Sequence, residues 1–288
     1  MEDKDLGFVG LGIMGRPMAK NLIDAGYSVT VYDISATSIE EMATYGASSA
    51  SSAREVAEKT PVVITMVPDS SDSEAAILGP NGVLEGASKG DTVIDMSSIA
   101  PATSQKIASL CEAQAVDFLD APVSGGEPKA IDGTLAVMVG GKSNVFDKYR
   151  DLINVMASSV VLCGNYGAGN TTKLANQIIV AANIEALAEA LVLSKKAGLD
   201  PNVVFEAIRG GLAGSTVMEA KAPMMIDGDF NPGFRIRLHQ KDLHNALLTG
   251  KDLGVPLPVT SLVQQMLGAL INDDKADFDH SAIANFLE

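Results

Sequence analysis

The chain has 288 residues, a formal net charge of −15, 47% hydrophobic residues and two cysteines. This length fits one large domain or two ordinary ones. The negative charge argues against nucleic-acid binding as a main task, and the absence of a CxxC pair argues against a disulfide framework or a cysteine zinc site. The first residues do not form a signal peptide and no apolar run reaches membrane-span length, so we expect a cytoplasmic protein that does not enter a membrane.

A glycine motif follows the first predicted strand. Leu6–Gly10 reads as a buried strand, and Gly10-Leu11-Gly12-Ile13-Met14-Gly15 then spells G-x-G-x-x-G before a helix that Gly26 closes. The first glycine allows a tight turn, the second lets a pyrophosphate approach the backbone, and the third lets helix and strand pack closely. The helix N-terminus would face the phosphates. A turn that binds nothing is the alternative, but the strand–turn–helix context favours dinucleotide binding.

The second predicted strand, Ser28–Tyr32, ends at Asp33, about 20 residues after the glycine motif, where the dinucleotide fingerprint places an acidic residue. A carboxylate there accepts hydrogen bonds from the ribose hydroxyls and repels a 2′-phosphate. Ile34 and Ser35 supply no arginine to offset that repulsion. We therefore expect NAD (NADH) as cofactor, although a Lys or Arg from another loop could still admit NADP.

More strands continue an alternating α/β pattern. The further predicted strands are Pro61–Val67, Thr92–Asp95, Phe118–Ala121, Leu135–Gly140 and Val160–Leu162. We predict a Rossmann-type doubly wound sheet in residues 1–163. Ligands bind beyond the carboxyl ends of such strands, so Met66, Val67, Pro68 and Ser98 are candidate cofactor contacts. Capping of the helix before Pro101 is an equally good reading of Ser97 and Ser98.

The loop that begins at Pro122 offers a possible anion site. Ser124, Gly125 and Gly126 can present a hydroxyl and successive backbone N–H groups, which suit a carboxylate. A plain Gly-Gly turn before residues 127–132 is the alternative.

A long helix over about residues 170–197 is predicted next. Asn170 can cap it, Gly198 can close it, and its faces are mostly apolar, so we expect it to be largely buried. Lys173, Asn176 and Gln177 share one face near its N-terminus. Such polar groups on a buried helix are costly unless a polar partner meets them.

Strand signals stop after this helix, which predicts an all-α C-terminal domain, residues 164–288, joined by the long interdomain helix. The predicted helical segments are Pro201–Arg209, Thr216–Ala222, Leu238–Leu253 and Pro258–Asn272. Residues 234–243 concentrate positive charge, and Lys241 there could reach cofactor or substrate; a solvated Lys–Asp pair is the alternative. His239, His244 and His280 lack metal-like spacing, so no metal site is expected.

Four motifs in order resemble the β-hydroxyacid dehydrogenase family over about Gly7 to His280. They are the glycine motif, Asp120-Ala-Pro-Val-Ser-Gly-Gly126, Gly167-x-Gly169-x-x-x-Lys173-x-x-Asn176, and Lys241-Asp242. The resemblance implies that Lys173 is catalytic, that Ser124, Gly125 and Gly126 hold the substrate carboxylate, and that Asn176 binds substrate. It also implies that Lys241, Val67, Pro68 and Ser98 lie beside the nicotinamide. We add Phe234 as a cofactor contact and Gln177, where relatives commonly carry Asn, as a substrate contact.

Residues 127–134 and 209–216 resemble family members that act on tartronate semialdehyde. We therefore expect NAD(P)H-dependent reduction of tartronate semialdehyde to D-glycerate, a small carboxylate substrate, with Lys173 as general acid and base. Oxidation of 3-hydroxyisobutyrate or reduction of another short semialdehyde is the alternative within the family. A non-catalytic cofactor-binding protein is the alternative from another class. The apolar long helix favours a homodimer or homotetramer.

Overall fold

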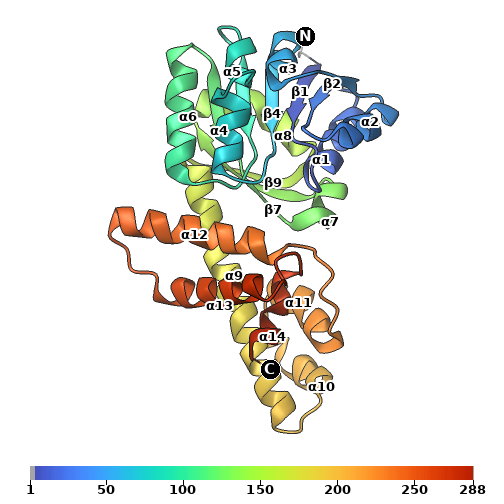
Figure 1. Cartoon of the computed structure of the whole chain (residues 1–288), viewed down its shortest axis with the longest axis vertical. Coiled ribbons are helices and arrows are strands. Elements are labelled where there is room, and N and C mark those ends of the chain that lie inside the picture. Colours follow the sequence, from blue (N-terminus) through green and yellow to red (C-terminus); the bar gives the residue numbers. More distant parts are fainter. Residues whose placement is uncertain (1–3, 288) are drawn as a thin grey trace. The chain divides into compact units, whose positions relative to one another are not determined.

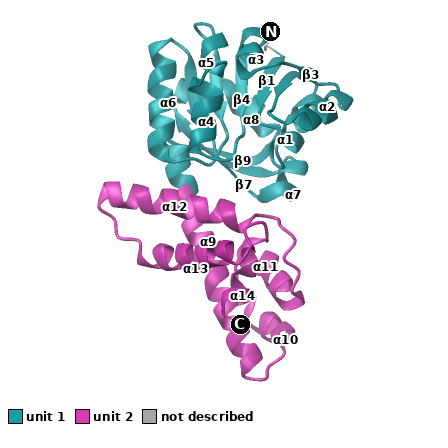
Figure 2. Ribbon diagram, in the orientation of Figure 1, with its two compact units in different colours: residues 1–173 teal, residues 174–288 magenta. Residues whose placement is uncertain are grey.

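The computed structural model describes residues 4–287 and separates into two compact units (Figure 1). Residues 1–173 form the first unit and residues 174–288 the second (Figure 2). The first unit holds a nine-stranded sheet with helices on both faces, and the second is built from helices. The predicted fold class, a Rossmann-type sheet followed by an all-α domain, is confirmed.

The sheet runs across the first unit, and its strand order does not follow the sequence. Its strands are β1 (Asp5–Val9), β2 (Ser28–Tyr32), β3 (Ser48–Ser49), β4 (Val62–Thr65), β5 (Thr92–Asp95), β6 (Asp117–Asp120), β7 (Val123–Ser124), β8 (Leu135–Gly141) and β9 (Ala157–Gly164). The order is β3-β2-β1-β4-β5-β6-β8-β7, and β9 pairs with β8. Strands β1 to β6 pair in parallel, whereas β8 is antiparallel to β6 and β7. Because the order first reverses between β1 and β4, their carboxyl ends open a crevice for a ligand.

The predicted strands are present, and two short ones were missed. Ser28–Tyr32 and Thr92–Asp95 match the prediction residue for residue. The two-residue strand β3 gives no pattern to detect, and Val123 and Ser124 were wrongly assigned to a loop. They form β7 because Val137 and Ala136 of β8 lie beside them, a partner that is distant in sequence.

Helices cover both faces of the sheet. They are α1 (Gly15–Asp24), α2 (Ala36–Thr44), α3 (Ala53–Lys59), α4 (Ser70–Leu78), α5 (Val83–Gly86), α6 (Pro101–Ala113), α7 (Gly126–Ile131) and α8 (Ser143–Asn154). Strand side chains alternate between the faces. Phe8 packs in one core with α1, α2 and α8, whereas Val9 packs in the other with α3, α4, α5 and α6. Both faces being buried explains why the strands read as continuous apolar runs.

The second unit is helical, as predicted, and is organised around α9. Its helices are α9 (Ala168–Lys196, beginning in the first unit), α10 (Pro201–Ile208), α11 (Thr216–Asp227), α12 (Ile236–Leu253), α13 (Pro258–Asn272), the 3₁₀ turn η1 (His280–Ile283) and α14 (Ala284–Leu287). Ile184 packs with α12, α13 and η1 in one cluster, and Leu187 and Leu191 pack with α10 and α11 in another. Helix α11 continues five residues beyond the predicted end, through Pro223.

Two expectations about the long helix are wrong. It is not largely buried in the single chain, since 33% of its most apolar stretch is buried and the side chains of Ile179 and Leu193 are 61% and 72% exposed. It is also long and apolar enough to pass length and composition criteria for a membrane span. Yet its buried face supplies both helical cores of the second unit, and Glu185 and Glu189 lie at its middle, where charge would be costly in a membrane. These observations fit a core helix.

Candidate functional site

The glycine motif occupies the turn from β1 to α1, and its three glycines face three different surroundings. A Cβ on Gly10 (φ +97°) would lie 2.2 Å from the Met66 carbonyl oxygen, and one on Gly15 would lie 1.9 Å from the Gly10 carbonyl oxygen. A Cβ on Gly12 would meet no atom within 4 Å. The first and third glycines therefore allow close packing of the turn, whereas the backbone at the second glycine has free space beside it. This arrangement fits a pyrophosphate held at the N-terminus of α1.

Asp33 closes the other side of this turn. It follows β2, and its carboxylate accepts the backbone N–H of Leu11 at Oδ2 (2.6 Å) and that of Ser35 at Oδ1 (2.7 Å). Each carboxylate oxygen has two lone pairs, so both can still accept a ribose hydroxyl. Arg16, in the first turn of α1, is already ion-paired with Glu41 (2.7 Å). The geometry thus suits a ribose with free hydroxyl groups better than a 2′-phosphate.

The loops after β4 and β5 are tied together beneath the predicted nicotinamide contacts. The Val67 N–H donates to the Ser97 hydroxyl oxygen (2.9 Å), so Ser97 links two loops. Asp95, fully buried at the end of β5, accepts the Thr65 hydroxyl (2.9 Å) and the Ser97 N–H (3.1 Å). Burial raises the pKa of Asp95 despite these hydrogen bonds. Helix capping does not explain Ser97, because α6 is capped at Ala100 without a side-chain hydrogen bond.

Asp120 fixes the start of the long helix against the sheet. It ends β6, is 0% exposed, and accepts the N–H groups of Gly167 (2.8 Å) and Asn170 (2.9 Å). A helix N-terminus carries partial positive charge, so a carboxylate there is favourable. Burial nevertheless raises the pKa of Asp120 to about 6; the two N–H groups oppose this rise, and the Asp95 carboxylate adds to it.

Glycines allow this close approach of helix and sheet. A Cβ on Gly140 would lie 2.4 Å from Asp120 Oδ1, and one on Gly169 would lie 2.4 Å from the Met138 carbonyl oxygen. Neither position can take a larger residue without moving the first turn of α9. Gly169 of the third sequence motif and Gly140 of β8 therefore set the distance between α9 and the strand ends.

Asn170 also anchors the start of α9 to the first unit's loops. It is not the predicted N-cap, because α9 already begins at Ala168. Its side chain accepts the Ile99 N–H (3.0 Å) and donates to the Ser104 hydroxyl (3.0 Å). Lys173 follows one turn later and is 6% exposed. The helix turn before Lys173 is thus anchored to the loop that carries Ser98 and to the strand that leads toward Ser124. The sequence patterns did not assign a role to Asp120, and they assigned Asn170 only a capping role, although both residues lie inside the motifs.

The candidate carboxylate loop begins with β7 and leads into the short helix α7. Gly125 and Gly126 have positive φ angles of 136° and 67°, which side chains rarely tolerate. Gly125 is the N-cap of α7, without a side-chain cap. Ser124 is half-buried at the end of β7. A plain tight turn does not describe this segment, because it joins a paired strand to a helix.

In the second unit, four polar side chains form a continuous chain. Asn176 Nδ2 donates to Gln177 Oε1 (2.9 Å), and Gln177 Nε2 donates to Asp242 Oδ2 (2.6 Å). Lys241 Nζ lies 3.1 Å from Asp242 Oδ1. Asp242 is 1% and Gln177 4% exposed. The Lys–Asp pair considered as an alternative for Lys241 is present, but it is part of this buried set and not a solvated surface pair.

Phe234 lies beside a buried polar cluster that sequence reasoning missed. Its ring packs edge-on against His239 and His280, with centroids 5.7 and 5.4 Å away. Asp279 holds the backbone here by accepting the N–H groups of Gly233 and Phe234 (3.0 Å each), and it pairs with Lys221 (2.9 Å). Burial alone would raise the pKa of Asp279, but the positive charges of His280 and Lys221 lower it to about 2. His239 and His280 are buried in this cluster, whereas His244 is exposed.

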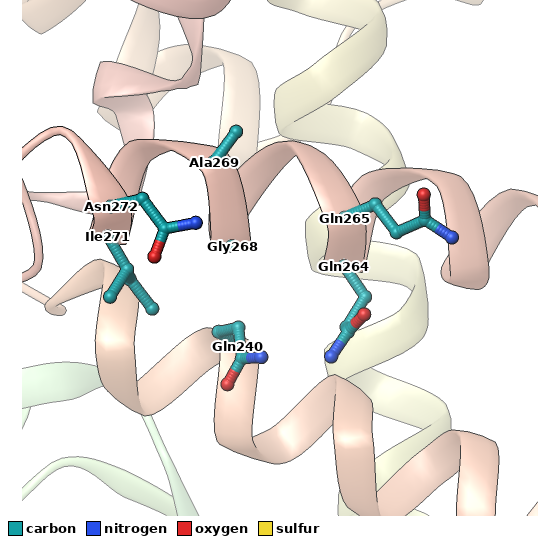
Figure 3. A pocket seen from close by; sticks show the side chains of 7 residues that line it. All are labelled: Gln240, Gln264, Gln265, Gly268, Ala269, Ile271 and Asn272. Atoms are coloured by element: carbon teal, nitrogen blue, oxygen red, sulfur yellow. The ribbon is translucent and has the colours of Figure 1, made fainter.

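One surface hollow lies apart from all of these residues. Figure 3 shows it between α12 and α13, lined by side-chain amides around Gly268. Its lining residues are Gln240, Gln264, Gln265, Gly268, Ala269, Ile271 and Asn272. None of the predicted site residues lines it, and among residues 4–287 no group of three His, Cys, Asp or Glu side chains could hold a metal ion.

Two family models together match nearly the whole chain. Residues 5–164 match the NAD binding domain of 6-phosphogluconate dehydrogenase. Residues 167–287 match the NAD-binding domain of NADP-dependent 3-hydroxyisobutyrate dehydrogenase. The first match spans the sheet and its glycine motif, and the second spans the helical part that carries Lys173 and Lys241.

Individual proteins agree with these models. The chain is 44% identical to 2-hydroxy-3-oxopropionate reductase of Escherichia coli (strain K12), with 98% of this chain and 97% of the relative covered. It is 38% identical to 2-(hydroxymethyl)glutarate dehydrogenase of Eubacterium barkeri, with 91% and 87% covered. A structure of 3-hydroxyisobutyrate dehydrogenase from Mycobacterium tuberculosis with L-serine superposes with a TM-score of 0.91 at 33% identity, covering 99% of each chain.

These relatives carry different substrate names, whereas the two family models together cover residues 5–164 and 167–287 of this chain. In this chain the region matched by the first family model contains the glycine turn, Asp33 and the loops at the carboxyl ends of β4 and β5. The chain therefore belongs to the β-hydroxyacid dehydrogenase family of NAD(P)-dependent oxidoreductases, enzymes that act on the hydroxyl groups of hydroxy acids.

Proposed function

We propose that this enzyme reduces tartronate semialdehyde (2-hydroxy-3-oxopropanoate) to D-glycerate with NADH. The observation that carries the proposal is the anchoring of Lys173, since the turn before this buried lysine is tied to the strand-end loops through Asp120 and Asn170. The 44% identity to a 2-hydroxy-3-oxopropionate reductase over 98% of the chain supports the choice of substrate.

Residues 10–15 and Asp33 would hold NADH, whose dihydronicotinamide would supply the hydride for the aldehyde carbon. Ser124, Gly125 and Gly126 bind the substrate carboxylate with a hydroxyl and backbone N–H groups. Lys173, as an ammonium, hydrogen-bonds the carbonyl oxygen, stabilises the charge that grows on it, and transfers a proton to it. Asn176 binds the substrate one turn further along the same helix. The aldehyde gains two electrons and two hydrogens, one as hydride and one as proton, and becomes the primary alcohol.

The cofactor contacts proposed in the first unit are residues 10–15, Asp33, Met66, Val67, Pro68 and Ser98. Phe234 and Lys241 are the contacts proposed in the second unit. The two short hydrogen bonds at Asp33 support a preference for NADH over NADPH, because the carboxylate would repel a 2′-phosphate. Parallel assays with both cofactors test this preference, and equal kcat/KM values would contradict it.

The test of the reaction is NADH oxidation followed by absorbance with three aldehydes. Tartronate semialdehyde should give a higher kcat/KM than methylmalonate semialdehyde or succinate semialdehyde. Lys173→Ala should lower kcat by about 10²- to 10⁴-fold, as expected for loss of a general acid, while the Kd for NADH stays near that of the wild type. Turnover near the wild-type rate in this variant would overturn the assignment of Lys173.

Two alternatives remain distinguishable in the same assay. A preference for the methyl-bearing substrate would indicate a 3-hydroxyisobutyrate dehydrogenase, which the 33% identity to such an enzyme favours as the second candidate. NADH binding without turnover of any aldehyde would indicate a non-catalytic cofactor-binding protein.

The exposed apolar side chains of the second unit support assembly into a homodimer or homotetramer. Ile179 and Leu193 on α9 are 61% and 72% exposed, and Val259 and Leu262 on α13 are 57% and 56% exposed. Large exposed apolar patches mark protein–protein interfaces, and we place the interface on these two helices. Sedimentation at micromolar concentration should show a dimer or tetramer, and a monomer would refute the assembly.

A cytoplasmic location is proposed from the thiols. Cys111 and Cys163 are both free, and burial raises the pKa of Cys111 to about 12. Unpaired thiols suit a reducing compartment. Cell fractionation tests this location, and recovery in the membrane or extracellular fraction would contradict it.

A further inference from the structure

The chain of side chains from Lys241 to Asn176 has a fixed direction of hydrogen bonding. Asp242 lies at its centre, between the Lys241 ammonium (3.1 Å from Oδ1) and the Gln177 amide (2.6 Å from Oδ2). A carboxylate only accepts hydrogen bonds. Gln177 must therefore turn its NH₂ group toward Asp242, which leaves Oε1 on the opposite side of its amide.

The same direction continues to Asn176. Gln177 Oε1 can only accept, so Asn176 must offer its own NH₂ group to it, and the two atoms lie 2.9 Å apart. The oxygen and nitrogen of an amide are otherwise hard to tell apart, and the hydrogen-bond network has to assign them. Here the acceptor-only carboxylate decides both amides, so Oδ1 of Asn176 is the atom turned away from Gln177.

The backbone of α9 is held at the same place. His239 of α12 lies with Nε2 3.3 Å from the Gln177 carbonyl oxygen, and its Nδ1 lies 2.8 Å from Nδ1 of His280. The side chain of Gln177 is thus hydrogen-bonded to Asp242, and its main-chain carbonyl oxygen lies next to His239. Both of these partners belong to α12. Gln177 and Asp242 are buried, whereas the two ends of the chain, Asn176 and Lys241, are half-buried and can meet a ligand. Of these two, Asn176 lies on α9, the helix that also carries Lys173.

We propose that Gln177 and Asp242 are positioning residues that fix the amide of Asn176 with its oxygen as the acceptor for the 2-hydroxyl of the substrate. This role rests on the proposed function and deepens it, because it assigns the choice of a hydroxyl over a methyl group to the direction of one buried hydrogen-bond chain. Gln177 acts through Asn176, since Oε1 and Nε2 of its amide each bind a neighbouring side chain. A pocket that hydrogen-bonds a substrate hydroxyl discriminates strongly against analogues that lack it.

Exchanging the charged and the amide side chain between positions 177 and 242 tests the direction of the hydrogen-bond chain. Gln177→Glu places two carboxylates against each other, and Asp242→Asn lets either end of the new amide face Gln177. The double variant Gln177→Glu with Asp242→Asn restores every link, because the Asn at 242 donates to the Glu at 177, which still accepts from Asn176. The double variant also keeps the net charge and leaves an oxygen at 242 to accept from Lys241.

We expect each single variant to lower kcat/KM for tartronate semialdehyde by about 10- to 100-fold and the double variant to recover to within about 3-fold of wild type. The singles should lose less activity toward methylmalonate semialdehyde, which has no 2-hydroxyl, so the ratio of the two kcat/KM values should fall and then recover. The Kd for NADH should stay near that of the wild type in all three. A general structural role would not move this substrate ratio.

Gln240→Glu is the matched control. It makes the same Gln-to-Glu change on α12, two residues from Asp242, at a side chain that lines the hollow in Figure 3 and belongs to no link of the chain. It should leave kcat/KM and the substrate ratio within about 2-fold of wild type. An equal loss in this control would attribute the single-variant effects to added charge and would overturn the proposal.

Two other results would also overturn it: single variants as active as wild type, or a double variant that shows the sum of both losses. Thermal unfolding of wild type, the two single variants and the double variant reports on the hydrogen-bond chain without any substrate. We expect a lower Tm in each single variant and recovery of the Tm in the double variant. If wild type fails to reduce tartronate semialdehyde, the proposed function fails. If wild type reduces it but the double variant does not recover, the positioning role fails.

Discussion

Asp120 in the first unit and Asp279 in the second are both 0% exposed, yet their pKa values move in opposite directions. The pKa of Asp120 is raised to about 6 and that of Asp279 is lowered to about 2. Both accept backbone N–H groups, so those bonds do not make the difference. Asp279 has the positive charges of His280 and of Lys221, whose ammonium lies 2.9 Å away, whereas the charge near Asp120 is another carboxylate, Asp95. For these two carboxyl groups, which are equally inaccessible to solvent, the sign of the neighbouring charge decides the direction of the pKa shift.

The largest expected effect comes from removing the charge of Asp279. Asp279→Asn should destabilise the protein by about 3 to 5 kcal/mol, because it leaves Lys221 as a half-buried cation without its partner. Urea unfolding at pH 7 measures this. A loss below about 1 kcal/mol would show that the ion pair does not set the stability of this cluster.

The direction of the pKa shift of Asp279 predicts how its contribution to stability depends on pH. Because the folded-state pKa of Asp279 is depressed to about 2, its contribution is fully present above its unfolded pKa near 4 and is lost as pH falls through about 2. The difference in unfolding free energy between wild type and Asp279→Asn should therefore shrink between pH 4 and pH 2.

Asp120 should show the opposite slope. Its folded-state pKa is raised to about 6, so the native state binds more protons than the unfolded state between about pH 4 and pH 6. Stability from this group should fall by about 2 to 3 kcal/mol as pH rises through that window. Comparing unfolding free energies of wild type and Asp120→Asn isolates the slope, which should be absent from the variant. An equal slope in both would assign it to other carboxyl groups.

The smallest effect is expected at a buried hydrogen bond without charge. Thr92 donates to the Tyr149 hydroxyl (3.0 Å) at the amino end of β5. Thr92→Val should cost about 1 kcal/mol, with no dependence on pH between 4 and 7 and no change in kcat. A pH-dependent loss here would mean that charge alone does not explain the contrast between Asp120 and Asp279.

Much of the fold could be predicted because its signals are local. The apolar run Thr92–Asp95 and the glycine spacing of residues 10–15 depend on neighbours within a few residues, and both were placed correctly. The long helix was also predicted, but its exposure was not. A helix that is apolar on most faces reads as buried, whereas the other helices of its unit cover only part of α9.

The positions of most strands along the chain, the dinucleotide turn and the family could be predicted from the sequence, because these rest on periodicity and on motifs of fixed spacing. Tertiary structure decided what the polar groups do. Asp120, Asn170 and Asp242 bind partners 47 to 71 residues away in sequence, and β7 exists because β8 lies beside it. The direction of a buried hydrogen-bond chain and the sign of a pKa shift depend on which groups meet in space, and spacing along the chain does not contain that information.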